Sequence, residues 1–193
     1  MSYIYKYEDL KDISWDEVDD MVNILYKDIK NYIESNNLSI KYISPIVRGG
    51  DIPAVMLSHM LNVVDMLPIQ LKNNNGNIDL KIGLDYVKDT SINDNECILL
   101  VDTNHITGRT ANIAVDIILD KFGSNTKIIY VTLTRDYTHR FSVEKVMHTL
   151  WARLTNESME LSEEECITLN IPYKKISIYP WENKEEELSE LNM

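Results

Sequence analysis

The chain has 193 residues, 44% of them hydrophobic, and a formal net charge of −12. This length suits one domain with a core of its own. The acidic excess argues against a nucleic-acid partner, because binding to phosphate backbones needs clustered Lys and Arg. No stretch approaches the roughly 20 apolar residues that span a bilayer, and the first residues carry acids where a secretory signal has an apolar run.

The predicted elements, taken in chain order, alternate between helix and strand. A helix is expected over residues 15–35, where apolar residues recur at helical spacing along one stripe. The predicted strands cover 40–47, 64–71, 97–102, 127–133 and 176–179, and further helices are predicted over 52–61 and 109–122. This alternation implies an α/β fold with a mostly parallel central sheet flanked by helices.

Three segments lie outside this alternation. Residues 72–96 are rich in turn-forming residues at their start, and a hairpin is expected around 80–87. Ser162, followed three residues later by Glu165, predicts the start of a capped helix. The acidic runs at 163–165 and 185–187 indicate solvated surface. The cysteines, Cys97 and Cys166, form no metal or redox spacing, so we expect reduced thiols and a cytoplasmic location.

The first segment with recognisable chemistry is a strand-to-helix turn within residues 40–61. An apolar strand ends at Val47, Arg48-Gly49-Gly50 forms the turn, and a helix is expected to begin near Pro53. Proline suits the first turn of a helix, where its missing N–H would be unpaired in any case. The guanidinium group of Arg48 is a planar fork that pairs with two phosphate oxygens.

A second turn of the same kind lies within residues 98–110. An apolar strand leads to Asp102, a short turn follows, and Thr107-Gly108-Arg109-Thr110 opens a helix. Gly108 permits a tight turn, and the helix start offers N–H groups and partial positive charge to a phosphate. Asp102 is at the carboxyl end of its strand, where open α/β sheets hold their ligands. The alternative is an ordinary capped turn, since both the Walker and the Rossmann glycine patterns are absent.

With these residues the chain resembles the type I phosphoribosyltransferases, particularly the hypoxanthine and xanthine-guanine branch. Residues 47–54 are similar to the family's pyrophosphate loop, and residues 101–110 to its phosphoribosyl diphosphate (PRPP) loop. Tyr179-Pro180-Trp181-Glu182 is similar to a Pro-Trp-acid segment of the same branch, and Ile13-Ser14-Trp15 is a weaker match. The resemblance implies one domain over 1–193, with a mobile loop, a small hood from 1–20 and 135–183, and an acidic tail, 184–193.

The family's reaction displaces pyrophosphate from C1 of PRPP with a nucleobase nitrogen. The resemblance implies that Arg48 and Gly49 hold the pyrophosphate, while Asp102 and Thr103 hold the ribose hydroxyls. The 5′-phosphate would lie against the following turn, formed by Ile106, Thr107, Gly108, Arg109 and Thr110. Mg²⁺ is the implied cofactor, with Glu182 and Asp102 as oxygen ligands.

The implied nucleobase site is matched less well. Arg135 is nearest to the place of a family lysine that contacts the purine, although a solvated strand-end cation is an equal alternative. Ile176 aligns with a stacking aromatic of the family. Tyr179 and Trp181 follow in the same segment, and Trp181 is either a base contact or part of the core.

Two positions depart from the family pattern. Thr103 stands where the family has a second acid, so it brings no charge to the ribose or the metal. Ile106 stands where the branch has an aspartate for the proton on purine N7, and isoleucine can neither donate nor accept one. Asp136 is a candidate replacement for that aspartate.

Several features keep two interpretations. His105, in the PRPP loop, either titrates near neutral pH or points to solvent, and His59 is expected to be a packed or rim residue. The interval 72–96 is either a lid that excludes water or an uninvolved hairpin. Residues 140–172 are either a dimer arm or a cover for the base site.

We therefore expect an Mg²⁺-dependent enzyme of nucleotide salvage that transfers a phosphoribosyl group from PRPP to a purine-like base. One alternative is a catalytically silent regulator that still binds PRPP or a nucleotide. Another is an unrelated doubly wound nucleotide-binding module. We also expect a homo-oligomer, a dimer or a tetramer.

Overall fold

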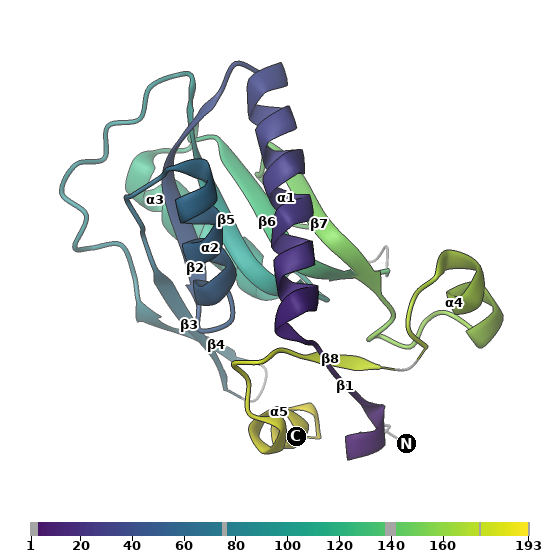
Figure 1. The fold of residues 1–193 in the computed structure, drawn as a ribbon. Coiled ribbons are helices and arrows are strands. Elements are labelled where there is room, and N and C mark those ends of the chain that lie inside the picture. The colour runs from purple at the N-terminus through teal and green to yellow at the C-terminus, as the bar shows by residue number, and fades with distance from the viewer. Residues whose placement is uncertain (1–3, 75–76, 138–141, 174, 193) are drawn as a thin grey trace.

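A six-stranded sheet forms the centre of the computed structural model, which describes residues 4–74, 77–137, 142–173 and 175–192. Its strands follow the order β4-β3-β2-β5-β6-β7 (Figure 1). Their bounds are Ser39–Val47 (β2), Ile69–Asn74 (β3), Asn77–Ile82 (β4), Glu96–His105 (β5), Ile128–Asp136 (β6) and His148–Thr155 (β7). Neighbouring strands run parallel except β3 and β4, which form an antiparallel hairpin. The predicted fold class is confirmed.

Helices cover both faces of this sheet. Helices α1 (Trp15–Ser35) and α2 (Asp51–Leu61) lie on one face, and α3 (Arg109–Phe122) lies on the other (Figure 1). The predicted helix over 15–35 is confirmed at both ends. It begins with a capping box, in which the Ser14 hydroxyl accepts from the N–H of Glu17 and the Glu17 carboxylate accepts from the N–H of Ser14.

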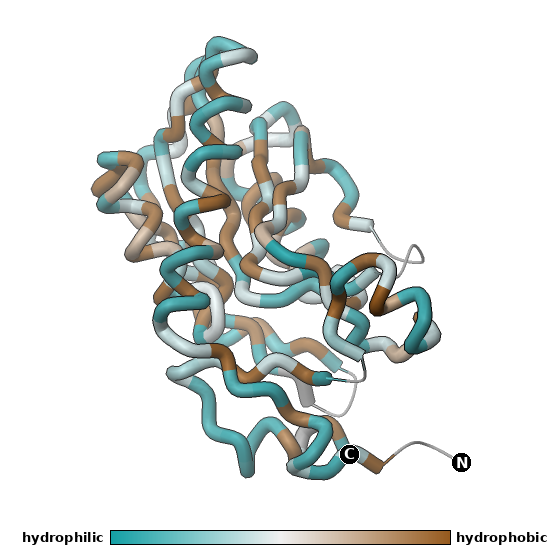
Figure 2. The backbone as a smooth tube through the Cα atoms, turned by 45° about the vertical axis from the view of Figure 1, so that its right-hand side comes forward, coloured by the Kyte–Doolittle hydropathy of each residue, from teal (hydrophilic) through white to brown (hydrophobic). Residues whose placement is uncertain are grey.

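The sheet divides the core into two hydrophobic clusters. The cluster under α1 and α2 includes Leu25, Leu57 and Val131, all fully buried. The cluster under α3 includes Ile118 and Tyr130, which are equally inaccessible. Hydrophobic residues accordingly concentrate along the central strands, while the peripheral loops are mostly hydrophilic (Figure 2). This packing holds the carboxyl ends of the parallel strands in fixed positions at one edge.

A second, two-stranded sheet lies beyond that edge (Figure 1). It pairs β1 (Leu10–Asp12) with β8 (Ile176–Ile178) in parallel, and we call it the hood sheet. A 3-10 turn, Tyr7–Asp9, precedes β1, and helix α5 (Lys184–Leu191) follows β8. The backbone N–H of Tyr5 donates to Asn192 Oδ1 at 2.8 Å, so the two ends of the described chain lie together.

Several predicted elements differ from the structure. The strand expected at 64–71 is β3, which begins at Ile69, and only an isolated bridge at Met66 precedes it. The hairpin falls at β3 and β4, upstream of the expected position. Strand β5 continues three residues past Asp102, because its ladder with β6 extends to His105. Strand β7 was not predicted.

The acidic segments also form helices. Helix α4 (Glu163–Leu169) begins at the predicted Ser162 cap. Residues 185–187, expected to be solvated tail, form the first turn of α5 instead. Asn183 caps that helix by accepting from the N–H of Glu186 at 3.0 Å, and acidic groups stabilise a helix amino terminus. Within the described residues, no helix has the length and apolar character needed to cross a membrane.

Candidate functional site: two strand-to-helix turns at one sheet edge

The first turn connects β2 to α2. Strand β2 ends at Val47, the Val47–Arg48 peptide bond is cis, and α2 begins at Asp51, two residues before the expected start. The N–H of Gly50 donates to the carbonyl of Ile46 at 2.9 Å, which closes the turn. The side chain of Arg48 is 69% exposed and extends from the turn.

The second turn connects β5 to α3. Gly108 has a φ of +70°, a left-handed conformation that glycine adopts at no steric cost, and α3 begins at the next residue. A cavity of about 200 Å³ lies against this turn. Its lining includes the five residues predicted to bind the 5′-phosphate, Ile106, Thr107, Gly108, Arg109 and Thr110, together with Asp102, Asn104 and His105. The volume suits a small anion such as a phosphate group, and the start of α3 supplies N–H donors.

The two turns touch each other. A Cβ atom placed on Gly49 would lie 2.4 Å from Thr103 Oγ1 and 3.6 Å from Asp102 Oδ1. This contact follows from the parallel pairing of β2 with β5, in which Pro45 is opposite Val101. Both turns therefore lie side by side at the carboxyl edge of the sheet.

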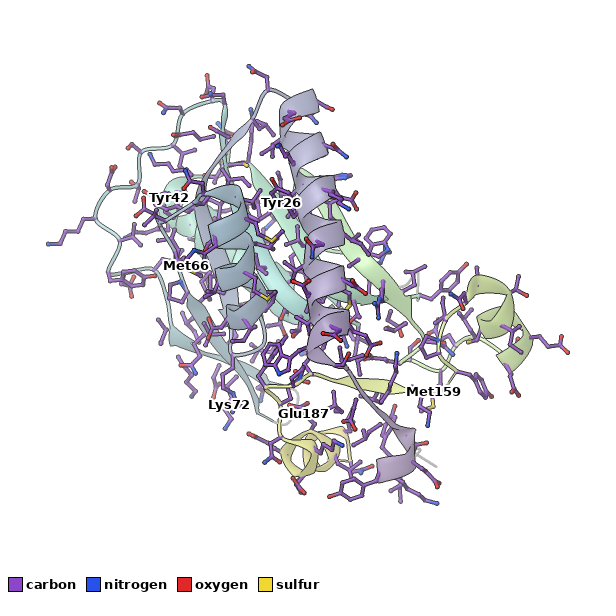
Figure 3. All side chains as sticks on the ribbon, viewed as in Figure 1. Tyr26, Tyr42, Met66, Lys72, Met159 and Glu187 are labelled. Carbon is purple, nitrogen blue, oxygen red and sulfur yellow. The ribbon has the colours of Figure 1, made fainter. Side chains whose placement is uncertain are left out.

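A larger cavity, of about 470 Å³, lies between the first turn and the carboxyl-terminal helix. Arg48 and Gly49 line one side, and Trp181 and Glu182 line another. Lys72 of β3 and Glu187 of α5, both labelled in Figure 3, also line it. Glu186 Oε1 accepts from Arg48 Nη2 at 3.0 Å, so the predicted pyrophosphate ligand is already paired with a carboxylate.

Three carboxyl groups near the two turns have raised pKa values. Burial raises the pKa of Asp102 to about 7, although the N–H of Thr103 donates to its Oδ1 at 2.8 Å. Burial, together with the charges of Glu187, Glu157 and Asp102, raises the pKa of Glu182 to about 7. The pKa of Glu157 is about 7 for the same first reason, burial. Such a set of acids favours a bound cation or hydroxyl donors.

Glu157 is the residue that the sequence did not reveal. Its side chain is 3% exposed and accepts hydrogen bonds from the Asn104 side-chain amide and, at 3.0 Å, from the N–H of Ser177. Asn104 belongs to β5, whereas Ser177 belongs to β8 of the hood sheet. One carboxyl group therefore connects the second turn to the hood sheet.

The predicted nucleobase residues are less well placed. Ile176 and Tyr179 are 6% and 2% exposed, and the Tyr179 hydroxyl is 2.8 Å from Thr134 Oγ1. The Arg135 guanidinium lies over the Trp151 ring, 4.3 Å from its centroid. None of these three lines the cavities at the two turns, whereas Trp181, which stacks on Tyr179, lines the larger one.

Three further candidate residues, Asp136, His105 and His59, lie in surroundings that do not point to a catalytic role. Asp136 is fully buried and accepts from the N–H and hydroxyl of Ser158, at 2.8 and 2.6 Å. These bonds hold its carboxylate against Ser158, and Asp136 does not line the cavity at the second turn. His105 is 5% exposed, and its ring packs edge-on against Tyr130, so it does not point to solvent. His59 is exposed on α2.

Metal coordination by protein atoms alone is weak at this edge. No group of three or more His, Cys, Asp or Glu side chains in the described ranges could hold a metal ion. Mg²⁺ commonly binds through one or two carboxylates and substrate phosphates, keeping several waters. Asp102 and Glu182 fit that arrangement, because both are carboxylates beside the cavities that would receive the phosphates.

Comparison with known proteins gives neighbours at the level of structure. No family model and no curated protein matches the sequence. A purine phosphoribosyltransferase from Pyrococcus horikoshii Ot3 superposes with a TM-score of 0.63 at 22% identity, covering 91% of this chain and 95% of its own. A xanthine-guanine-hypoxanthine phosphoribosyltransferase from Helicobacter pylori gives a TM-score of 0.54 at 14% identity, covering 93% and 97%.

A third neighbour is a hypothetical protein from Neisseria gonorrhoeae with bound ppGpp. Its TM-score is 0.66 at 15% identity, and the match covers 95% of this chain and 96% of that one. The chain thus has the fold of the purine phosphoribosyltransferases over nearly its whole length.

Proposed function

We propose that the protein is an Mg²⁺-dependent phosphoribosyltransferase that joins a purine-like base to the 5-phosphoribosyl group of PRPP. The observation that carries this proposal is the contact between the two turns at Gly49 and Thr103. The cavity at the start of α3 therefore lies next to the turn that carries Arg48, an arrangement that supports the binding of one ligand by both turns. The neighbouring folds support the same reaction class.

In this reaction the bond from C1 to the pyrophosphate oxygen breaks and a bond from C1 to a base nitrogen forms. Positive charge develops on the ribose while negative charge collects on the pyrophosphate. Arg48 and the N–H of Gly49 bind the leaving group, and the cavity of residues 106–110 binds the 5′-phosphate. Asp102 and Glu182 would hold Mg²⁺ through carboxylate oxygens, and the bound ion would supply positive charge to the pyrophosphate.

In this proposal Asp102 orients the ribose. Its carboxylate accepts hydrogen bonds from the ribose hydroxyls, and Thr103 presents a hydroxyl without charge beside it. The base nitrogen loses a proton in the product. Ile106 cannot take that proton, so we infer release to water or to the leaving pyrophosphate. The two buried cysteines are unpaired, in keeping with a role in cytoplasmic nucleotide salvage.

The direct test is to incubate the full chain with PRPP, Mg²⁺ and hypoxanthine, guanine, xanthine or adenine in turn. We expect pyrophosphate release with at least one base. Asp102→Asn, which preserves the shape of the side chain, is the matched variant and should lose most of that activity. Absence of release with every base would reject the proposal.

A second candidate function is a regulator that binds PRPP or a pyrophosphorylated nucleotide without turnover. Two observations favour it: the ppGpp held by the neighbour from N. gonorrhoeae, and the pairing of Arg48 with Glu186. Calorimetric titrations with PRPP and with ppGpp separate the two functions. Saturable binding without pyrophosphate release would support the regulator.

A further inference from the structure

A large cavity lies outside the candidate site. It has a volume of about 920 Å³ and is lined by residues of β7, α4, the hood sheet and the first half of α1. Among the described residues, none that lines it also lines the cavities at the two turns. Small-molecule sites in proteins typically have volumes of about 300–1,000 Å³. We call it the hood cavity.

The walls of the hood cavity combine apolar side chains with positive charge. Apolar side chains such as Ile13, Leu154 and Ile171 line it together with the ring of Trp151. Three cations, Lys11, Arg153 and Lys175, reach its surface, and no described lining residue is an aspartate or glutamate. The lining is therefore positively charged although the whole chain has a net charge of −12.

These cations are only partly neutralised by their neighbours. Lys11 Nζ and Arg153 Nη1 share one carboxylate oxygen of Glu17, at 3.2 and 3.0 Å, and Asp20 lies 3.9 Å from Arg153. Lys175 donates to the backbone carbonyl of Glu8, and no described carboxylate lies within ion-pair distance of it. A positive charge therefore stays available beside an apolar floor.

We propose that the hood cavity binds a small amphipathic monoanion, with an aromatic or branched apolar body and one carboxylate, sulfonate or phosphate group. The apolar walls would receive the body, and Lys175 would pair with the anionic group. Such a ligand is not a substrate of the proposed reaction, so the site lies beyond that function.

The same cavity is connected to the second turn by hydrogen bonds. Thr134, in its wall, donates to Asn104 Oδ1 at 3.1 Å, and the backbone of Ser177, also in its wall, donates to Glu157. Glu157 in turn accepts from Asn104, which lines the anion cavity. Both paths end on Asn104. We infer that a ligand that moves Thr134 or Ser177 changes the affinity of the anion cavity through Asn104, and such coupling is reciprocal; this linkage rests on the proposed function.

The binding test uses two dyes with one apolar body. 1-Anilinonaphthalene-8-sulfonate carries a sulfonate, and N-phenyl-1-naphthylamine lacks it. We expect one molecule of the sulfonate to bind the full chain, about tenfold more tightly than the neutral dye, as one charged contact predicts. Equal affinities, or no saturable binding, would overturn the proposal.

Matched variants locate the bound dye. Lys175→Met should weaken the binding of the sulfonate dye about tenfold and leave the affinity of the neutral dye unchanged. Lys175→Arg should retain the binding of the sulfonate dye. Lys81→Met removes a lysine from β4, paired with Asp79 and remote from the hood cavity, and should have no effect. An equal loss of affinity for the sulfonate dye in the Lys175→Met and Lys81→Met proteins would overturn the assignment of the dye to the hood cavity.

Titration with PRPP and Mg²⁺ separates this inference from the proposed function. If the two sites are linked, the dissociation constant of the dye changes with rising PRPP concentration until it reaches a plateau. If PRPP and the dye compete for one site, the constant continues to rise with the PRPP concentration. A plateau supports the hood cavity as a separate, coupled site, and unlimited competition overturns it. If PRPP fails to bind while the dye binds as predicted, the proposed function fails and the hood cavity stands.

Discussion

Gly49 and Gly50 follow each other in one turn, yet they exclude a side chain for different reasons. A Cβ on Gly50 would lie 2.3 Å from the carbonyl oxygen of Val101 and 3.0 Å from backbone atoms of Ile46. A Cβ on Gly49 would meet the Thr103 hydroxyl, which belongs to a side chain. A side chain at position 50 would therefore force two strands apart, whereas one at position 49 would displace the side chain of Thr103.

We predict that Gly50→Ala destabilises the protein by about 1–3 kcal/mol or more, because backbone atoms of β2 and β5 must move apart. Gly49→Ala should cost less stability, since Thr103 can rotate, but should weaken PRPP binding at least about tenfold. Urea unfolding measures the first effect and calorimetry the second. Equal stability losses in the two variants would contradict this division.

A substitution at Ile106 can test how the base is oriented. It lines the anion cavity where the resembled branch has an aspartate. We predict that Ile106→Asp increases the rate with hypoxanthine or guanine, because a carboxylate next to purine N7 can take up its proton. Ile106→Asn, which is similar in size but cannot ionise, is the control and should not increase the rate. An unchanged rate in a folded Ile106→Asp protein would mean that N7 lies elsewhere.

At the scale of elements, helix α5 supplies the carboxylate that pairs with Arg48 in the first turn. The ion pair between Glu186 and Arg48 is exposed at 46% and 69%, so it contributes only about 0–1 kcal/mol to stability. It nevertheless occupies the guanidinium group that pyrophosphate would use. An anion entering this cavity has to displace Glu186 or share Arg48 with it.

We predict that Glu186→Gln strengthens the binding of pyrophosphate with Mg²⁺ by about two- to fivefold, because a competing carboxylate is removed. Glu185→Gln, one residue earlier in the same helix, removes an equal charge and is the control. Calorimetry at fixed ionic strength measures both. Weaker binding in the Glu186→Gln protein would mean that Glu186 assists the metal instead of competing with the anion.

The elements that could be predicted are those with strong local patterns. Helix α1 has an apolar stripe and a capping box, and both turns combine glycine with an adjacent buried strand. Strand β7 was missed because its residues 148–155 mix polar and apolar types at the sheet edge, where most are only half-buried. Helix α5 was missed because its acids suggest solvation, although their position at a helix start is what stabilises it.

The site was predictable only where it is local in sequence. Asp102 and residues 106–110 form one cavity because they share one turn. Glu157 gave no such signal, since its partners, Asn104 and Ser177, are 53 and 20 residues away. The surroundings of Arg135 could not be predicted either, because the neighbouring strand β7 supplies the Trp151 ring on which its guanidinium lies.

At the scale of the whole molecule, buried acids make stability depend on pH. The pKa values of Asp102, Glu157 and Glu182 are about 7 in the folded protein, above their ordinary values. The folded state therefore holds protons more tightly than the unfolded state. Their contribution is fully present below the ordinary carboxyl pKa and is lost as the pH rises through 7.

We predict that the free energy of unfolding falls between pH 5 and pH 8, and that Glu157→Gln reduces this fall by on the order of 2 kcal/mol. Glutamine keeps an acceptor for the N–H of Ser177 and cannot ionise. Glu165→Gln is the control, because the pKa of Glu165 is lowered by its hydrogen bonds to Ser162. Urea unfolding across this pH range gives the slopes. The same slope in the wild-type and Glu157→Gln proteins would contradict the prediction.

The parallel pairing of Leu10 with Ile176 has a consequence for biosynthesis. A nascent chain made only as far as Thr155 already contains every strand of the central sheet, yet β1 still lacks its partner. Both strand-to-helix turns therefore precede β8 in the order of synthesis. A chain truncated after Thr155 and freed from the ribosome would lack the hood sheet, so ligand binding to that truncated protein would report whether the two turns bind without it.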